Sequence, residues 1–188
     1  MIYRIADRCI KIDSLHEEVH KLCSDYRVPD GNVDFAITTT QADIDYERQR
    51  SALEDEKEGV EIRYFTDSYL ETLAVYRKMA EQLLAFDTLL FHGSVIAVDG
   101  KGYLFTAKSG TGKSTHTRLW REYFGERAIM VNDDKPLLKI TENNVMVYGT
   151  PWDGKHRLSS NVVVPLQGIC ILNRGEENRI EKISAKEG

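Results

Sequence analysis

A glycine-containing loop closed by Gly-Lys-Ser has the composition of a segment that binds nucleotide phosphates. Such a loop aims several backbone N–H groups at one anion, and Gly110 and Gly112 can adopt the dihedral angles that this requires. Lys113 adds a positive charge for the outer phosphates, and the Ser114 hydroxyl suits Mg²⁺. The residues expected to bind a nucleoside triphosphate with Mg²⁺ are Ser109, Gly110, Thr111, Gly112, Lys113, Ser114 and Thr115.

Two adjacent carboxylates, Asp133 and Asp134, follow an apolar segment downstream of this loop. Mg²⁺ prefers hard oxygen ligands, and an alcohol is a poor nucleophile unless a base removes its proton. We expect Asp133 to be the base and Asp134 to hold the metal with Ser114, and the reverse assignment of the two aspartates stays open. A solvated strand end is the other interpretation of an Asp-Asp pair.

A basic segment at 151–157 could contact a substrate or the transferred phosphoryl group. Trp152 offers a flat face for stacking, and Gly154 gives the backbone freedom. Lys155 and Arg157 can neutralise phosphate oxygens as charge spreads during transfer. The alternative is a solvent-exposed turn that happens to be basic.

The segments around the glycine-containing loop support a nucleotide site. Residues 101–107 have the composition of a buried strand, and 115–123 that of a helix, so strand, loop and helix follow in the required order. Ala107 stands where the general pattern has glycine, which is one departure. A Gly/Ser-rich turn before a helix would be the simpler interpretation.

The rest of the chain alternates between expected strands and helices, which predicts an α/β fold. Asp99-Gly100 between two apolar runs is typical of a hairpin. We expect a small α+β region over 1–85 and a kinase-like domain over 86–188. The other expected strands are 2–12, 32–39, 60–65, 89–98, 128–132, 136–139, 145–148, 162–164 and 168–172, and the other expected helices are 16–23, 42–59 and 68–86.

Composition narrows the classes of partner and compartment. The 188 residues carry a net charge of -5, which argues against nonspecific nucleic-acid binding. The three cysteines are widely spaced and fit neither a disulfide framework nor a zinc ribbon. We expect a cytoplasmic protein without membrane association, and a homo-oligomer is compatible with the sequence.

In order along the chain, His92-Gly93, Ser109-Gly110-Thr111-Gly112-Lys113-Ser114 and Val131-Asn132-Asp133-Asp134 resemble the catalytic domain of HPr kinase/phosphorylase and its relatives in the ATP-dependent phosphoenolpyruvate carboxykinase superfamily. The resemblance covers about 89–183. It implies a P-loop on a mixed β-sheet, with the two aspartates as magnesium ligand and base and with His92 close enough to assist the base. It does not extend to the N-terminal region or to a protein-docking signature. The chain also stops where such domains continue with helices, which indicates a compact or incomplete version of the domain.

The sequence therefore predicts an ATP- and Mg²⁺-dependent phosphotransferase acting on a hydroxyl of a protein or small metabolite. Lys113 and the loop amides would hold the phosphates, while Arg157 and Lys155 would steady the developing charge. A regulatory ATP-binding module without transfer is one alternative. A zinc peptidase is another, because His16-Glu17-x-x-His20 could place two metal ligands on one helix face. A guanine-nucleotide-specific switch protein is a weaker alternative. Residues 172–175 only faintly resemble the Asn-Lys-x-Asp motif that reads the guanine base, and they lack its aspartate.

Overall fold

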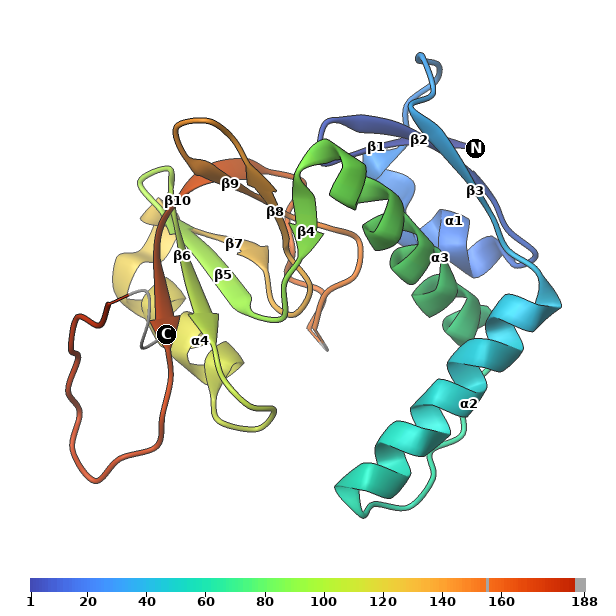
Figure 1. Ribbon diagram of the computed structural model, residues 1–188. Helices are drawn as coiled ribbons and strands as arrows, with labels where there is room; N and C mark the ends of the chain where they lie inside the picture. Colours follow the sequence, from blue (N-terminus) through green and yellow to red (C-terminus); the bar gives the residue numbers. More distant parts are fainter. Residues whose placement is uncertain (155, 185–188) are drawn as a thin grey trace. The chain divides into compact units, whose positions relative to one another are not determined.

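The computed structural model describes residues 1–154 and 156–184 of the chain. It divides into two compact units, Met1–Leu89 and Leu90–Gly188. The chain is a mixed α/β protein with a three-stranded sheet near the N-terminus and a seven-stranded mixed sheet beyond it (Figure 1). None of the helices in the described ranges is long and apolar enough to cross a membrane.

The first unit contains a small sheet of order β1-β2-β3, whose strand β3 packs against α3, and the helices α1 and α2 pack against α3. β2 pairs antiparallel with β1 and parallel with β3. Buried aliphatic side chains from the strands and from α3, including Ile10, Ile37 and Leu70, form its core. Its elements are β1 (Ile2–Ile5), β2 (Arg8–Asp13), α1 (Glu17–Leu22), η1 (Ser24–Tyr26), β3 (Phe35–Thr38), α2 (Gln41–Glu58), α3 (Asp67–Leu83) and η2 (Leu84–Phe86).

The N-terminal segment 2–12, expected as a single strand, is a hairpin. Ile5 pairs with Arg8, and the two residues between them, Ala6 and Asp7, have φ angles of 50° and 64°. Left-handed backbone at both central positions is the geometry that joins twisted antiparallel strands. Because neither residue is glycine, the sequence carried no obvious turn signal.

The expected strand at 60–65 was wrong, because this segment has no regular secondary structure. It follows Gly59, which ends α2 in a left-handed conformation with φ 67°. The Arg63 side chain and backbone N–H donate to the buried carboxylate of Asp55 on α2. The segment is therefore held by an ion pair, and Val60, Ile62 and Tyr64 remain exposed. Alternating apolar residues form a strand only where a sheet edge is available for pairing.

The seven-stranded sheet has the order β4-β8-β9-β10-β6-β5-β7. β10 and β6 are parallel, whereas the pairs β8/β9, β9/β10, β5/β6 and β5/β7 are antiparallel. The strands are β4 (Thr88–Leu90), β5 (Ser94–Val98), β6 (Lys101–Thr106), β7 (Ala128–Asn132), β8 (Leu137–Ile140), β9 (Val145–Tyr148) and β10 (Val163–Ile171). The helix α4 (Lys113–Phe124) and η3 (Gly125–Arg127) connect β6 to β7.

Most of the expected strands of this sheet are present, with two differences. The stretch 89–98 is interrupted at 91–93, where the backbone N–H groups of Phe91 and Gly93 bond to Pro136 and Asp134 instead of continuing one strand. The stretches 162–164 and 168–172 belong to one strand, β10, whose pairing shifts register between Leu166 and Gly168. The hairpin at Asp99-Gly100 is confirmed, because Val98 pairs with Lys101 across it.

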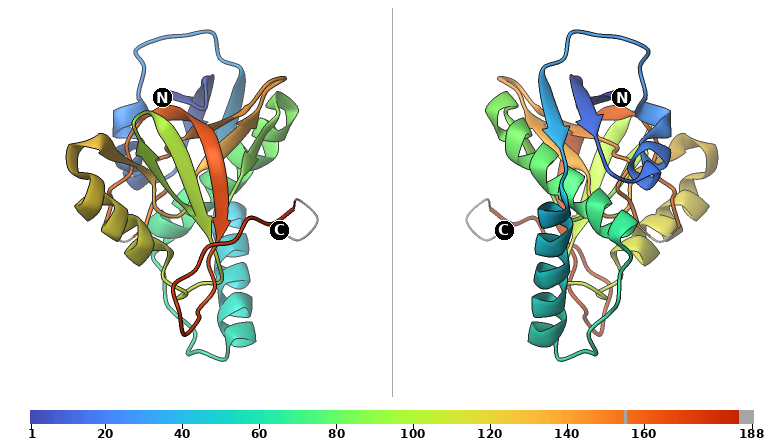
Figure 2. Two further views of the ribbon diagram at one scale, coloured as in Figure 1. Left: turned by 90° about the vertical axis from the view of Figure 1, so that its left-hand side faces the viewer. Right: turned by 90° about the vertical axis from the view of Figure 1, so that its right-hand side faces the viewer.

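Helix α4 packs against β5, β6 and β7. Figure 2 shows it along one side of the strands β5 and β6. It begins two residues earlier than the expected start at 115 and ends one residue after 123. Sequence order therefore places the glycine-containing loop between the end of β6 and the start of α4.

Candidate functional site

The glycine loop, defined here as residues 107–112, joins β6 directly to α4. Gly110 and Gly112 have φ angles of 74° and 120°, which side-chain-bearing residues rarely adopt. Gly112 is the N-cap of α4, and the His116 N–H donates to its carbonyl at 2.9 Å. The first N–H groups of a helix have no partner inside it, and α4 has no acidic residue in its first turn. The start of α4 thus presents free donors and the positive end of the helix dipole.

Two basic side chains contact the carbonyls of the glycine loop. Lys113 is 9% exposed, and its Nζ donates to the Ala107 carbonyl at 3.1 Å. Arg174, which follows β10, donates from Nη2 to the Gly110 carbonyl at 2.7 Å. Figure 2 shows the segment after β10 running beside this loop. The segment 172–175, weakly suggestive of a guanine-reading motif, therefore contacts the loop through an arginine.

Asp133, directly after β7, is tied to α4 through two hydroxyl groups. Its carboxyl group is buried, and the Ser94 hydroxyl on β5 donates to Oδ1 at 2.6 Å. Ser94 Oγ also lies 3.0 Å from Thr117 Oγ1, which in turn lies 3.3 Å from the Ser114 carbonyl. Strands β5 and β7 and the first turns of α4 thereby meet at one buried hydrogen-bonded network.

The segment after β9 covers the other oxygen of the same carboxylate. A Cβ atom on Gly154 would lie 2.9 Å from Asp133 Oδ2, so a side chain at this position would displace either the carboxylate or the backbone. The buried Asn132 amide holds this segment by donating to the carbonyls of Thr150 and Trp152. The position of the Asp133 carboxylate is therefore fixed from two sides.

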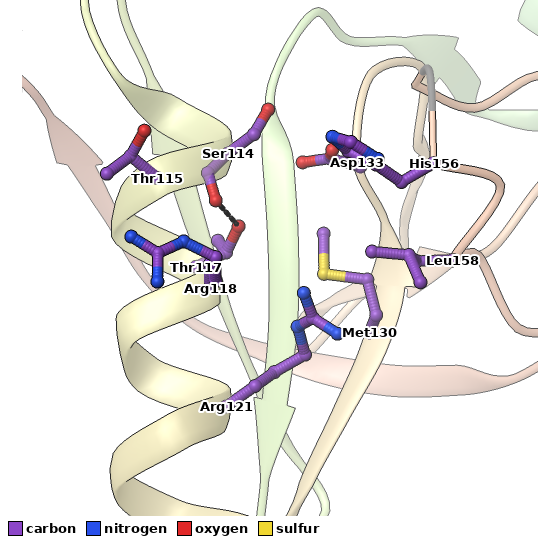
Figure 3. A pocket seen from close by; sticks show the side chains of 9 residues that line it. All are labelled: Ser114, Thr115, Thr117, Arg118, Arg121, Met130, Asp133, His156 and Leu158. Atoms are coloured by element: carbon purple, nitrogen blue, oxygen red, sulfur yellow. Dashed lines mark hydrogen bonds between the residues drawn. The ribbon is translucent and has the colours of Figure 1, made fainter.

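A cavity of about 450 Å³ lies between α4 and β7 (Figure 3). Ser114 and Asp133 face it from opposite walls, and Met130 and Leu158 supply an apolar part. Arg118, Arg121 and His156 make its lining basic. The remaining lining residues are Thr115 and Thr117.

Asp134 and His92 form a separate pair. His92 Nε2 lies 3.4 Å from Asp134 Oδ1, and Lys135 Nζ lies 3.9 Å from Oδ2. The Gly93 N–H donates to the Asp134 carbonyl, which brings the start of β5 beside the aspartate pair. Neither His92 nor Asp134 lines the cavity. The structure thus joins Ser114 with Asp133, and Asp134 with His92.

The basic segment 151–157 is only partly as expected. Trp152 is 4% exposed, which corrects the expectation of a free stacking face. Arg157 is exposed, has φ 47°, and its N–H donates to the Gly154 carbonyl at 3.1 Å, but its side chain does not line the cavity. Lys155 lies outside the described residues.

Hard oxygen donors at the cavity fit Mg²⁺ better than a softer metal. Within 1–154 and 156–184, no group of three or more His, Cys, Asp or Glu side chains is arranged to hold an ion. This is compatible with Mg²⁺, which usually takes one or two protein oxygens and completes its shell with phosphates and water. Ser114 and Asp133 supply such oxygens at the cavity, and Asp134 is the next residue in the chain but lies outside the lining.

The histidines of the His-Glu-x-x-His segment are engaged in hydrogen bonds of the first unit. His16 Nδ1 lies 2.8 Å from the buried carboxylate of Glu71. His20 uses both ring nitrogens, at 2.8 Å from the Tyr3 hydroxyl and 3.1 Å from the Ser14 hydroxyl. Burial lowers the pKa of His20, with smaller effects from the charges around it. These contacts give both rings a structural role.

Several residues of this site were not anticipated from the sequence. Arg118 and Arg121 follow Ser114 at helical spacing, so periodicity on α4 could have placed all three on one face. Ser94 comes from another part of the chain, and no local pattern marks it. Gly154 and His156 lie in the segment 151–157 that was expected to contact a substrate, but the sequence did not predict that Gly154 would lie against Asp133. Their proximity to Asp133 or to its cavity results from the order of the strands.

Comparisons with known proteins give a resemblance in fold only. No known family model matches the chain, and no curated protein matches its sequence. Among solved structures, the chain is similar to the HPr(Ser) kinase/phosphatase from Coxiella burnetii, with a TM-score of 0.35 and 16% identity, over 49% of this chain and 70% of that one. A similarity of this size supports no conclusion about activity.

Proposed function

We propose that the protein is an ATP- and Mg²⁺-dependent phosphotransferase that acts on a hydroxyl group. The observation that carries this proposal is a cavity at the N-terminal end of α4, the helix that begins directly after the glycine loop. The Ser114 hydroxyl and the buried carboxylate of Asp133 both line this cavity. A structural turn would need none of the polar groups that face this cavity.

The chain's own residues divide the work of phosphoryl transfer. The amides at the start of α4 and the Lys113 ammonium group bind the β- and γ-phosphates of ATP. The acceptor oxygen forms a bond to the γ-phosphorus as the bond from this phosphorus to the bridging β–γ oxygen breaks, and ADP leaves. Asp133 takes the proton of the acceptor hydroxyl. Arg157 is the expected partner of the negative charge that develops on the transferred group, and its side chain would have to move to reach the cavity, which it does not line.

Mg²⁺ would be held by Ser114 and Asp134 or, in the reverse assignment, by Ser114 and Asp133, which face the same cavity. When bound, the ion neutralises negative charge on the phosphate oxygens. His92 lies beside Asp134 and orients this carboxylate. Ser94 and Gly154 keep Asp133 in place, so the base needs little reorganisation before it accepts a proton.

Incubation with γ-labelled ATP and Mg²⁺, with separate pools of proteins and metabolites, tests this function. We expect label in one pool, and we expect Lys113→Ala to lose both ATP binding and transfer. Lys101→Ala, on an exposed position at the start of β6, is the matched control and should behave as wild type. ATP binding without transfer to either pool would instead identify a regulatory ATP-binding module.

A further inference from the structure

The cavity beside Asp133 has a basic end that the transfer reaction does not account for. Ser114, Arg118 and Arg121 lie on the cavity side of α4 (Figure 3). An α-helix rises about 1.5 Å per residue, so Ser114 and Arg121 are about 10 Å apart along the axis. One end of the cavity therefore holds the hydroxyl of Ser114 and the acid, and the other holds guanidinium groups.

Arg121 has unused hydrogen-bonding capacity at this end. Its Nε is buried and has no hydrogen-bond partner among the described residues. Arg118 pairs with Glu122 one turn along α4, but both side chains are more than half exposed, and such pairs contribute little. Arg121 lines the cavity, so an anionic ligand there could accept charge-assisted hydrogen bonds from its guanidinium group. His156 adds a further donor from the facing segment.

The nucleotide is a poor candidate for these arginines. Its phosphates are assigned to the free amides at the start of α4 and to Lys113, and Arg121 comes two helical turns later. Met130 and Leu158 line the same cavity and would contact an apolar portion of a ligand. The lining therefore suits a short molecule with a polar group at each end.

We propose that the phosphoryl acceptor is a small hydroxylated molecule with its own anionic group, either a carboxylate or a phosphate ester. Its hydroxyl lies at Asp133, and its anionic group binds Arg121 and Arg118 through charge-assisted hydrogen bonds. The role of the ligand as acceptor rests on the proposed function. The anion site itself does not.

Binding of matched probes to protein saturated with Mg²⁺ and a non-hydrolysable ATP analogue tests this assignment by calorimetry. The pairs are glycerol 3-phosphate with glycerol, and 4-hydroxybutyrate with 1,4-butanediol. We expect the anionic member of at least one pair to bind and the neutral members not to bind. Comparison of the two pairs separates phosphate from carboxylate preference.

Substitutions then locate the anion. Arg121→Gln should lower the affinity for the anionic probe about ten- to hundredfold, as expected for loss of a charge-assisted hydrogen bond. Arg121→Lys should recover part of this loss because it keeps the charge. Arg50→Gln, on exposed α2, is the control and should leave both ligands unaffected. The affinity for the ATP analogue should not change in any of the three variants.

Three results would overturn the anion site. They are equal binding of the anionic and neutral probes, no saturable binding of either anionic probe, and an equal loss of ATP-analogue and probe affinity in Arg121→Gln. Titration of the anionic probe into the Lys113→Ala variant, without the ATP analogue, distinguishes failure of the anion site from failure of the proposed function. Probe binding that survives Lys113→Ala but not Arg121→Gln keeps the anion site even if no phosphoryl transfer is found.

Discussion

Asp133 and Asp134 are adjacent in sequence but lie in different surroundings. Asp133 is buried under the Ser94 hydroxyl and the Gly154 backbone, whereas Asp134 is a third exposed and lies beside His92. Substituting each in turn separates a base from a metal ligand. Removing a base lowers the rate of the chemical step without weakening ground-state binding, while removing a metal ligand raises the Mg²⁺ requirement.

We expect Asp133→Asn to reduce the transfer rate by about a hundredfold or more, with the affinity for Mg²⁺ and ATP kept. The reason is that the amide is close in size to the carboxylate but does not accept the proton of the acceptor. Steady-state kinetics with γ-labelled ATP, together with calorimetric titration of an ATP analogue, would measure both quantities. Unchanged turnover would show that Asp133 is not the base.

For Asp134→Asn we expect the opposite pattern, which is a higher Mg²⁺ concentration for half-maximal activity and a nearly recovered rate at saturating Mg²⁺. The amide keeps one oxygen but loses the negative charge that attracts the ion. Magnesium titrations of both variants side by side provide the measurement. If only Asp133→Asn shifts the magnesium dependence, the roles of the two aspartates are exchanged.

The segment that follows β9 acts on the site through its backbone. A Cβ on Gly154 would lie 2.9 Å from Asp133 Oδ2, so Gly154→Ala must displace the carboxylate or the segment. We expect about a tenfold lower transfer rate, because small displacements of a catalytic group are costly, and an unchanged affinity for ATP. Gly168→Ala is the matched control, since nothing lies within 4 Å of its Cβ position. Equal kinetics of the two variants would contradict a positioning role for this segment.

Helix α3 is tied to the rest of the first unit by the buried carboxylate of Glu71. This carboxylate accepts from the backbone N–H groups of Leu15 and His16, at 2.6 and 2.8 Å, and from the Thr39 hydroxyl. Burial alone would raise the pKa of Glu71, but the hydrogen bonds from Thr39, Leu15 and His16 outweigh it, and the pKa is lowered from 4.5. The charged form is therefore the one that stabilises the contact.

A lowered pKa in the folded state contributes stability that is complete above pH 4.5 and is lost as the pH falls through the lowered pKa. We expect Glu71→Gln to destabilise the protein by about 2 kcal/mol at pH 7, because an amide cannot accept from all these donors. The difference from wild type should shrink in acid, where wild type loses the same contribution. Urea unfolding at several pH values measures this, and a constant difference across pH would rule out the ionised carboxylate as its source.

At the level of the entire chain, the expected nucleotide site belongs to the second unit alone. We expect a non-hydrolysable ATP analogue with Mg²⁺ to protect the amides of 107–118 and 149–154 from hydrogen exchange, and to leave 35–58 in the first unit unchanged. At a ligand concentration of a hundred times Kd, the stabilisation would be about 2.7 kcal/mol. Protection confined to the first unit would place the nucleotide elsewhere.

Local signals in the chain anticipated much of this architecture. Most strands and helices, the hairpin at Asp99-Gly100, and the glycines at the end of β6 were found from their neighbours, since dihedral preference and hydrophobic period are properties of a few adjacent residues. The same reasoning failed at Ala6-Asp7, where a tight turn forms without glycine, and at 60–65, where an alternating segment has no edge to pair with.

Strand order was not available from local patterns, and it decides how the site is assembled. Because β5 lies between β6 and β7, Ser94 bridges the helix that follows the glycine loop and the acid at position 133, which is 39 residues away. The approach of Gly154 to this acid and the unpartnered Nε of Arg121 are likewise consequences of packing between distant segments. Residue types therefore indicated the chemistry, whereas the three-dimensional arrangement selected which side chains face one another, since contacts far apart in sequence depend on how the whole sheet pairs.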